Sequence, residues 1–204
     1  RKPMVLSSKG MGDLLLQIFD SVNAGIMEVE KVVVGIGGTG INDLGLGMME
    51  AFGLEMYDKN DNRLDVLPKN YSLAKKIVVP EVKLPFELVL IIDVENPLLG
   101  IDGASLVFAE QKGATDEEAM QLEKGFSNIL NELEIDDDTQ SKLSGAGGGI
   151  AAAMKLFFNA REKFADQFIK EDLKVHVGMT DIDLVITGEG KFDAQTYFNK
   201  GAFI

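Results

Sequence analysis

Cysteine is absent from this sequence of 204 residues, and histidine occurs only once, as His176. Without cysteine the chain can form neither disulfide bonds nor thiolate metal sites. His176 lies between two valines in the stretch KVHVG, so the sequence offers no candidate Ser-His-Asp triad. We predict a cytoplasmic protein, since a chain without disulfide bonds suits a reducing compartment.

Basic residues are scarce relative to acidic ones. The chain has 20 Lys and Arg against 33 Asp and Glu, which gives a formal net charge of −13. Nucleic acids and anionic membranes bind basic surfaces, so we expect neither as a partner. Long apolar runs are also missing: stretches such as LVLII at residues 88–92 are far shorter than the roughly 20 residues that span a bilayer.

The overall composition is that of a globular protein. Hydrophobic residues make up 46% and charged residues 26% of the chain, close to the averages for soluble domains. Its length suits one large or two small domains. The chain starts RKPMVLSS, with neither an initiator methionine nor a signal peptide, and ends KGAFI just after a glycine-rich turn. We therefore expect both ends of the intact protein to extend further.

Hydrophobic periodicity near the start predicts a helix, a strand and a second helix. Apolar residues recur at helical spacing over 13–26, and the β-branched run 31–36 is typical of a buried strand. After several glycines, 44–52 has a helical pattern that Gly53 would end, and LEMY at 54–57 is a candidate strand. These elements together predict a βαβ unit.

The rest of the chain continues the alternation of strands and helices. The apolar run 87–94 suits a strand covered on both faces. Thr115 and Glu118 form a capping box ahead of a helical pattern, a second helical pattern starts near 150, and 183–187 is a further strand candidate. We predict an α/β fold with a largely parallel sheet of Rossmann-like or flavodoxin-like βαβ units, plus a second α/β domain.

The stretch GIGGTG contains the pattern G-x-G-x-x-G through Gly35, Gly37 and Gly40, ahead of an expected helix. Such a turn presents backbone N–H groups at the positive end of a helix and suits a phosphate. Asp58 lies 18 residues after Gly40, near the position of the ribose-binding acid of NAD proteins, so an NAD site stays open. A tight turn without a ligand explains this segment equally well.

Asp43 lies three residues after Gly40, and its negative charge disfavours a pyrophosphate at this turn. Its carboxylate would repel the anion unless a cation lies between them or the carboxylate acts as a base. Both roles suit phosphoryl transfer better than hydride transfer.

Carboxylates recur where the expected strands end, and ligands of parallel sheets bind beyond those ends. They are Asp43, Asp93, Glu189 and Asp193. Magnesium prefers such hard oxygen ligands alongside phosphate. Lysines that could neutralise phosphate charge are Lys112, Lys191 and Lys200. We expect three clusters to converge, at residues 35–43, 93–100 and 187–193.

Four longer motifs stand in order along the chain. They are GIGGTGINDLGLGMM at 35–49, DVENPLLG at 93–100, QKGAT at 111–115 and VITGEGKFDAQT at 185–196. They resemble the runs GIGGSATNDGGAGM, D-V-x-N-P-L-x-G, Q-K-G-A-T and V-I-T-G-E-G-R-x-D-x-Q-T of the bacterial glycerate kinase family. Four motifs in the same order are far more specific than a single glycine pattern.

The resemblance implies an ATP-dependent kinase that phosphorylates D-glycerate, with Mg²⁺, on two α/β domains of which one interrupts the other. We place the Rossmann-like part at residues 1–57 and 172–204 and the second part at residues 58–171. The partner would be the small molecule glycerate, with no nucleic acid and no membrane, and a homodimer is left open.

Positions that match the family motifs give the expected site. The catalytic candidates are Asp43 and Asp193, as base or metal carboxylates, and Lys191, as a phosphate contact. The nucleotide-binding candidates are Gly35, Gly37, Gly38, Thr39, Gly40 and Asn42. The substrate-binding candidates are Asn96, Gln111, Lys112 and Thr196. The metal ligands would be Asp93 and Glu189.

The first motif also departs from the family pattern. Thr39, Gly40 and Ile41 replace Ser-Ala-Thr, and the bulky residues Leu44 and Leu46 fill two small positions. We expect these leucines to narrow or reshape the site. Two other classes therefore stay open: an NAD-dependent oxidoreductase, and a non-catalytic ligand-binding paralogue.

Overall fold

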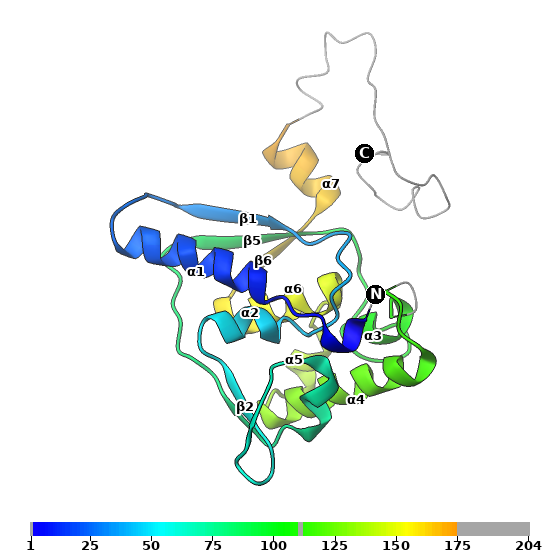
Figure 1. Ribbon diagram of the computed structural model, residues 1–204. Coiled ribbons are helices and arrows are strands. Elements are labelled where there is room, and N and C mark those ends of the chain that lie inside the picture. Colours follow the sequence, from blue (N-terminus) through cyan, green and yellow to red (C-terminus); the bar gives the residue numbers. More distant parts are fainter. Residues whose placement is uncertain (1, 110–111, 175–204) are drawn as a thin grey trace.

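The computed structural model describes residues 2–109 and 112–174 of the chain, and Figure 1 shows their arrangement. A parallel sheet has the strand order β1 (Lys31–Gly35), β5 (Glu87–Ile92) and β6 (Arg161–Phe164). A small antiparallel sheet has the order β3 (Arg63–Leu64), β2 (Glu55–Tyr57) and β4 (Lys76–Val78). The fold is α/β with a parallel sheet, as the alternation of elements predicts.

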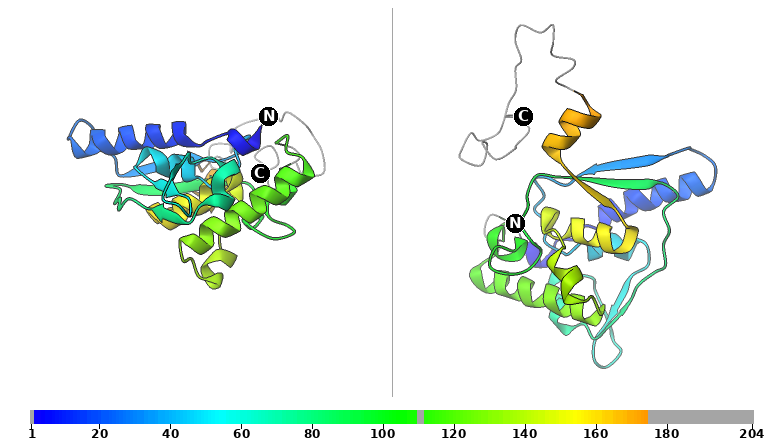
Figure 2. Two further views of the ribbon diagram at one scale, coloured as in Figure 1. Left: turned by 60° about the horizontal axis from the view of Figure 1, so that its bottom comes forward. Right: turned by 180° about the vertical axis from the view of Figure 1, so that it is seen from behind.

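Helices surround these sheets. The α-helices are α1 (Lys9–Asn23), α2 (Leu46–Ala51), α3 (Ala104–Val107), α4 (Asp116–Glu132), α5 (Asp137–Ser141), α6 (Ile150–Phe158) and α7 (Ala165–Gln167). Segments of other helix types are η1 (Pro3–Val5), η2 (Pro68–Leu73), η3 (Ala146–Gly148) and η4 (Phe168–Asp172). The start of the chain lies next to α3 in Figure 1 and in both views of Figure 2.

The central strand of the parallel sheet is β5, whose continuous apolar sequence lets it pack on both faces. Leu88, Leu90 and Ile92 are buried on one face, and Val89 is buried on the other. The prediction of a strand covered on both faces is confirmed. In β1, however, Val33 is 44% exposed, so the prediction of a buried strand is wrong there. Among the described residues β1 is an edge strand that pairs only with β5.

The expected βαβ unit is also wrong in its second strand. LEMY does form β2, but β2 pairs antiparallel with β3 and β4 in the other sheet. The parallel neighbour of β1 is β5, more than 50 residues later, in the register Val33 to Val89. A strand as short as β2 carries too little pattern to specify its partner.

The parallel sheet contains strands from both of the α/β parts that the sequence predicts. Strands β5 and β6 belong to residues 58–171, which the sequence assigns to the second part, yet both join the sheet of β1. The sheet therefore connects the two expected parts, and the antiparallel sheet with α4 makes up the other end of the molecule (Figure 1).

The core joins these layers through close contact of α1 and α2. A Cβ atom added at Gly12 of α1 would lie 2.3 Å from the carbonyl oxygen of Met48 in α2, so only glycine allows this approach. Met48, Met49 and Leu46 of α2 are fully buried as a result. Within residues 2–109 and 112–174, none of the helices combines the length and the apolar character that a bilayer span needs.

The helix α4 begins at the predicted capping box. The backbone N–H of Glu118 donates to Thr115 Oγ1 at 3.2 Å, and the N–H of Thr115 donates to Glu118 Oε2 at 2.9 Å. Thr115→Ala is expected to lower the free energy of unfolding by about 1 kcal/mol, because it leaves a helix-terminal N–H without its acceptor. Urea denaturation followed by circular dichroism measures this loss. Thr115→Ser keeps the acceptor and should stay within a few tenths of a kcal/mol of wild type; equal losses in both variants would contradict the capping role.

Candidate functional site

Two loops leave the same edge of the parallel sheet, because β1 and β5 run in the same direction. The glycine loop (residues 36–45) follows β1, and a second loop (residues 93–103) follows β5. A Cβ atom added at Gly37 would lie 3.5 Å from Asp93 Oδ2, so the two loops lie side by side. Gly37, Gly38 and Asp93 are exposed. The structure therefore brings together the first two of the three predicted clusters.

A third loop, the turn 145–149, joins these two, and the sequence analysis did not include it in the site. The N–H of Leu44 donates to Gly148 O at 3.0 Å, and the N–H of Gly145 donates to Asn96 O at 2.9 Å. Gly147, Gly148 and Gly149 all have positive φ angles, which glycine adopts readily. The stretch GAGGG was the sequence signal that could have pointed to this turn.

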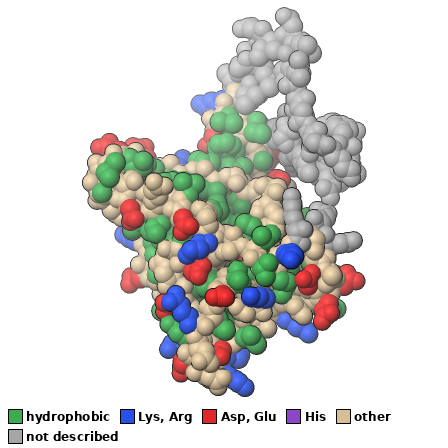
Figure 3. Space-filling model, viewed as in Figure 1, with side chains coloured by type: hydrophobic (Ala, Val, Ile, Leu, Met, Phe, Trp, Pro, Cys, Tyr) green, Lys and Arg blue, Asp and Glu red, His purple; other side chains and the backbone are tan. Residues whose placement is uncertain are grey.

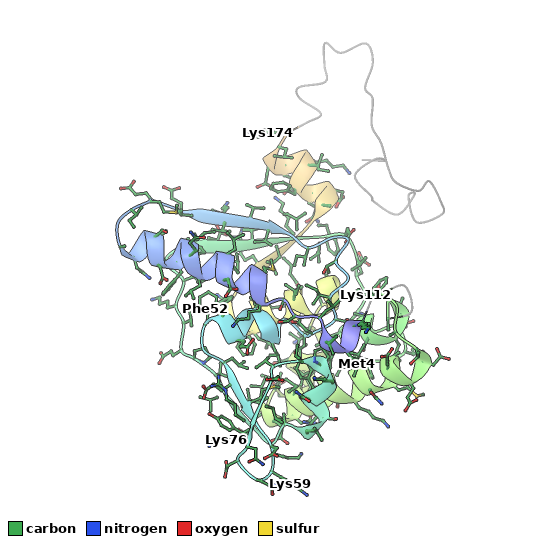
Figure 4. The ribbon with its side chains drawn as sticks, in the orientation of Figure 1. Met4, Phe52, Lys59, Lys76, Lys112 and Lys174 are labelled. Atoms are coloured by element: carbon green, nitrogen blue, oxygen red, sulfur yellow. The ribbon has the colours of Figure 1, made fainter. Side chains whose placement is uncertain are left out.

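Lys112 connects the QKGAT motif to the glycine loop. Its side chain is buried, with 8% of the residue exposed, and its Nζ donates to the carbonyl oxygen of Ile41 at 2.8 Å. Figure 4 labels Lys112 on the same side of the molecule as Met4 of η1, far from Lys59 in the β2–β3 turn. A buried ammonium group thus lies against the glycine loop.

Asp43 is fully buried, and both of its carboxylate oxygens accept hydrogen bonds from the chain. Oδ2 accepts from the N–H of Ser8 at 2.6 Å, from Ser8 Oγ at 2.8 Å and from the N–H of Gly47 at 3.3 Å. Oδ1 accepts from the N–H of Gly45 at 3.0 Å, and the Tyr71 hydroxyl donates to the Asp43 carbonyl oxygen at 2.7 Å. The Asp43 side chain is directed into the protein.

Burial raises the pKa of the Asp43 carboxyl above its ordinary value, because removal from water disfavours the charged form. The hydrogen bonds from Ser8, Gly45 and Gly47 act in the opposite direction and lower it. The group is therefore a carboxyl whose surroundings are formed by its own chain.

The anion at the start of α2 is the carboxylate of Asp43 itself. The N–H groups of Gly45 and Gly47, which a bound phosphate would use, already donate to Asp43. The carboxylate of the chain itself occupies the positive end of this helix. The N–H groups of Gly45 and Gly47 are therefore not available to a pyrophosphate, and an NAD site would have to use the exposed glycines of the loop instead.

Asn42 is fully buried, and neither its Oδ1 nor its Nδ2 has a hydrogen-bond partner among the described residues. A Cβ atom added at Gly148 would lie 2.8 Å from Asn42 Oδ1, so the turn 145–149 covers this amide closely. An unpaired buried polar group costs about 1–3 kcal/mol, and Asn42 has two of them. The amide is therefore the best candidate in the glycine loop for a group that needs a further partner.

The two bulky residues of the first motif point into the core. Leu44 and Leu46 are buried and belong to the main hydrophobic cluster, so the expectation that they narrow the site is wrong, and their effect on its shape stays a prediction. Leu44 adopts φ +54°, a left-handed conformation that costs a non-glycine residue roughly 1–2 kcal/mol. Burial of its side chain offsets this cost.

The remaining predicted residues fall into three groups. Gly35 ends β1 and pairs with Ile91, and Thr39 Oγ1 accepts from the N–H of Ile41 at 3.1 Å, next to Gly40. Asn96 Nδ2 donates to the carbonyl oxygen of Asp102 at 2.9 Å and holds the second loop. Those outside the described residues are Gln111, Glu189, Lys191, Asp193 and Thr196.

The described residues form no metal site by themselves. Within residues 2–109 and 112–174, no group of three or more His, Cys, Asp or Glu side chains could hold a metal ion. Asp93 is the predicted metal ligand that the structure places, and Glu189 lies outside the described residues.

The sequence matches the family model described as glycerate kinase family over residues 1–203. The chain belongs to the glycerate kinase family. It is 32% identical to glycerate 2-kinase of Escherichia coli (strain K12) and 34% identical to glycerate kinase of Haemophilus influenzae, in each case over 98% of its own residues. A family assignment over nearly the whole chain agrees with the four motifs.

A solved structure supports the same assignment. The crystal structure of a protein assigned as glycerate kinase 2 from Salmonella typhimurium LT2 matches all of this chain with a TM-score of 0.76 and 32% identity. The chain spans about half the length of the relatives it matches: 52% and 53% of the two enzymes and 54% of the crystallised chain.

Proposed function

We propose that the intact protein is a glycerate kinase that transfers the γ-phosphoryl group of ATP to a hydroxyl group of D-glycerate. The observation that carries the proposal is the meeting of three family motifs at one edge of the parallel sheet: the glycine loop lies beside Asp93 and receives a hydrogen bond from Lys112. This edge is where α/β proteins bind their ligands. Membership in the glycerate kinase family supports the substrate class.

Exposed and unpaired groups of the glycine loop would hold the ligands. Gly37 and Gly38 expose backbone at the carboxyl end of β1, and Asn42 has an unpaired amide. The Lys112 side chain lies beside this loop and donates to the carbonyl oxygen of Ile41. We assign nucleotide phosphate to the exposed glycines and the substrate to the side of Asn42 and Lys112.

We propose Asp93 as a magnesium ligand, although no group of three or more possible metal ligands forms among the described residues. Its carboxylate beside Gly37 would repel a phosphate group at that place unless a cation lay between them. Because the described residues form no metal cluster, we assign no step to the ion. Magnesium would neutralise phosphate charge when bound, and Glu189 is the proposed additional ligand.

The sequence predicted both Asp43 and Asp193 as base or metal carboxylates, but we now propose different roles for the two. Asp43 reaches neither solvent nor the exposed part of the glycine loop, so we propose that it positions the loop. Asp193 is then the proposed acceptor of the glycerate hydroxyl proton, and Lys191 the proposed phosphate contact. In phosphoryl transfer such positioned groups act mainly by orientation and by charge neutralisation.

Small molecules are the proposed partners. On the face that Figure 3 shows, Lys and Arg side chains lie among Asp and Glu side chains and form no separate basic region. This distribution agrees with the net charge of −13 and with glycerate and ATP as partners rather than nucleic acid. We place the reaction in the cytoplasm, since it consumes ATP and the chain has no cysteine to form disulfides.

The experiment uses the full-length protein with ATP, magnesium and D-glycerate, and measures phosphoglycerate by ³¹P NMR. Asp93→Asn is expected to lower kcat/KM about 10–100-fold, because it removes a carboxylate that would hold the cation beside the phosphate. The matched control is Glu95→Gln, which removes the same charge from an exposed residue two positions later and should keep the activity. Absence of phosphoglycerate in the wild type, or equal activity of Asp93→Asn, would contradict the proposal.

A ligand-binding protein without turnover is the second candidate, because the first motif departs from the family pattern at Thr39, Gly40 and Ile41. Calorimetry on the same full-length protein would separate the two. Glycerate binding with no phosphoglycerate formed would favour the binding protein.

A further inference from the structure

We infer that Ser8 is a positioning residue of the active site: with Asp43 it forms a latch that fixes the glycine loop and α2 to the segment ahead of α1. The latch is defined by Ser8 and Asp43 and their hydrogen bonds to each other, to Gly47 and to Met48. The expected effect of the latch on kcat rests on the proposed glycerate kinase function.

The hydroxyl group of Ser8 forms hydrogen bonds with residues far away in the sequence instead of capping its own helix. Ser8 is the N-cap residue of α1, where a serine side chain commonly accepts a hydrogen bond from its own helix, yet it makes no such bond here. Its Oγ donates to Asp43 Oδ2 at 2.8 Å and accepts from the N–H of Met48 at 2.8 Å. The local cap is therefore replaced by two bonds to residues 35 and 40 positions away.

The latch is enclosed on all sides. Ser8 is 1% exposed, and Asp43 is fully buried. A Cβ atom added at Gly47 would lie 2.1 Å from Ser7 Oγ, 2.7 Å from Asp43 Oδ2 and 2.9 Å from the Ser8 nitrogen. Glycine at position 47 therefore lets the start of α2 approach the serine segment closely enough for these hydrogen bonds.

The exposed part of the glycine loop lies between two fixed points. At one end the N–H of Ile36 donates to the carbonyl oxygen of Ile91 at 3.2 Å, next to the parallel sheet. At the other end Asp43 is held by Ser8. Gly37 and Gly38, the proposed phosphate contacts, lie between these two points, so the latch positions them through the backbone that connects them to Asp43. Small displacements of positioned groups lower turnover strongly.

The test compares Ser8→Ala with Asp58→Ala in the full-length enzyme. Ser8→Ala removes the hydroxyl donor to Asp43 and the acceptor for the N–H of Met48, and leaves the backbone bond from Ser8 to Asp43. Asp58→Ala also removes buttressing hydrogen bonds, but in the β2–β3 turn at the far end of the molecule, where Figure 4 labels Lys59. It serves as the control for a general loss of stability.

Two measurements decide the outcome. Steady-state kinetics should show kcat at least about tenfold lower for Ser8→Ala at a temperature where both variants are folded, with kcat unchanged for Asp58→Ala. Hydrogen exchange should show the amides of residues 36–48 exchanging about tenfold faster in Ser8→Ala alone, with β5 unchanged.

Unchanged exchange over residues 36–48 in Ser8→Ala would overturn the latch. Faster exchange with unchanged kcat would overturn its positioning role in catalysis. A wild-type enzyme that forms no phosphoglycerate would instead refute the proposed function, and the exchange comparison would still decide whether Ser8 fixes the loop.

Discussion

Replacing Asp43 by alanine is expected to lower the free energy of unfolding of the full-length protein by about 3–5 kcal/mol. The substitution leaves four buried donors without an acceptor: the N–H and hydroxyl groups of Ser8 and the N–H groups of Gly45 and Gly47. Each unpaired buried group costs about 1–3 kcal/mol, reduced where the cavity admits water. Urea denaturation monitored by circular dichroism measures the change.

Two variants give this prediction its controls. Asp93→Ala removes the same side chain from an exposed position in the neighbouring loop and should stay within about 0.5 kcal/mol of wild type. Asp43→Asn keeps the shape and one acceptor oxygen but turns an NH₂ group toward a donor, so its loss should be smaller than that of Asp43→Ala. A loss below about 1 kcal/mol for Asp43→Ala would show that the carboxylate does not hold these donors.

The second large effect is expected at Gly148, in the turn that joins the two ligand loops. Gly148→Ala should lower the free energy of unfolding by about 3 kcal/mol or more. The added Cβ atom would lie 2.1 Å from the carbonyl oxygen of Ile41 and 2.8 Å from the Cα atom of Asn42, both parts of the backbone. The clash adds to the cost of a left-handed conformation at φ +70°.

Gly25→Ala separates the two contributions. Gly25 has almost the same backbone angle, φ +69°, but an added Cβ would have no described atom beyond its chain neighbours within 4 Å. The variant should therefore lose only the roughly 1–2 kcal/mol of the left-handed conformation. Thermal or urea unfolding of both variants gives the difference, which measures the close approach of the turn to the glycine loop. Equal losses would contradict that close approach.

Long periodic segments were predictable from the sequence. The capping box and apolar spacing predicted α4, and the structure confirms both, with α4 at Asp116–Glu132. The apolar run of β5 predicted a strand covered on both faces, and the residues on both of its faces are buried. These features depend on residues two to four positions apart, whose spacing fixes the local conformation.

Short segments and edges were not predictable in the same way. The strand β2 has three residues, and its pairing with β3 and β4 depends on the chain around it. The exposure of Val33 depends on what covers that face of β1, and no pattern within residues 31–36 encodes this.

In the candidate site, too, some features were predictable from the sequence and others were not. The sequence identified the glycine loop, Asp93 and Lys112 through motifs, and the structure brings these together. It also singled out Asp43, but the direction of this side chain depends on Ser8, which had no motif of its own.

The sequence by itself determined the family, the α/β class and the residue types of the ligand loops, because motifs and periodicities are properties of neighbouring residues. Only the tertiary structure decided that the carboxylate of Asp43 fills the start of α2 and that the turn 145–149 closes over Asn42. The physical reason is that a buried polar group takes its partners from whatever the fold brings next to it. For Asp43 those partners are Ser8, 35 residues away in the sequence, and Gly45 and Gly47, two and four residues away.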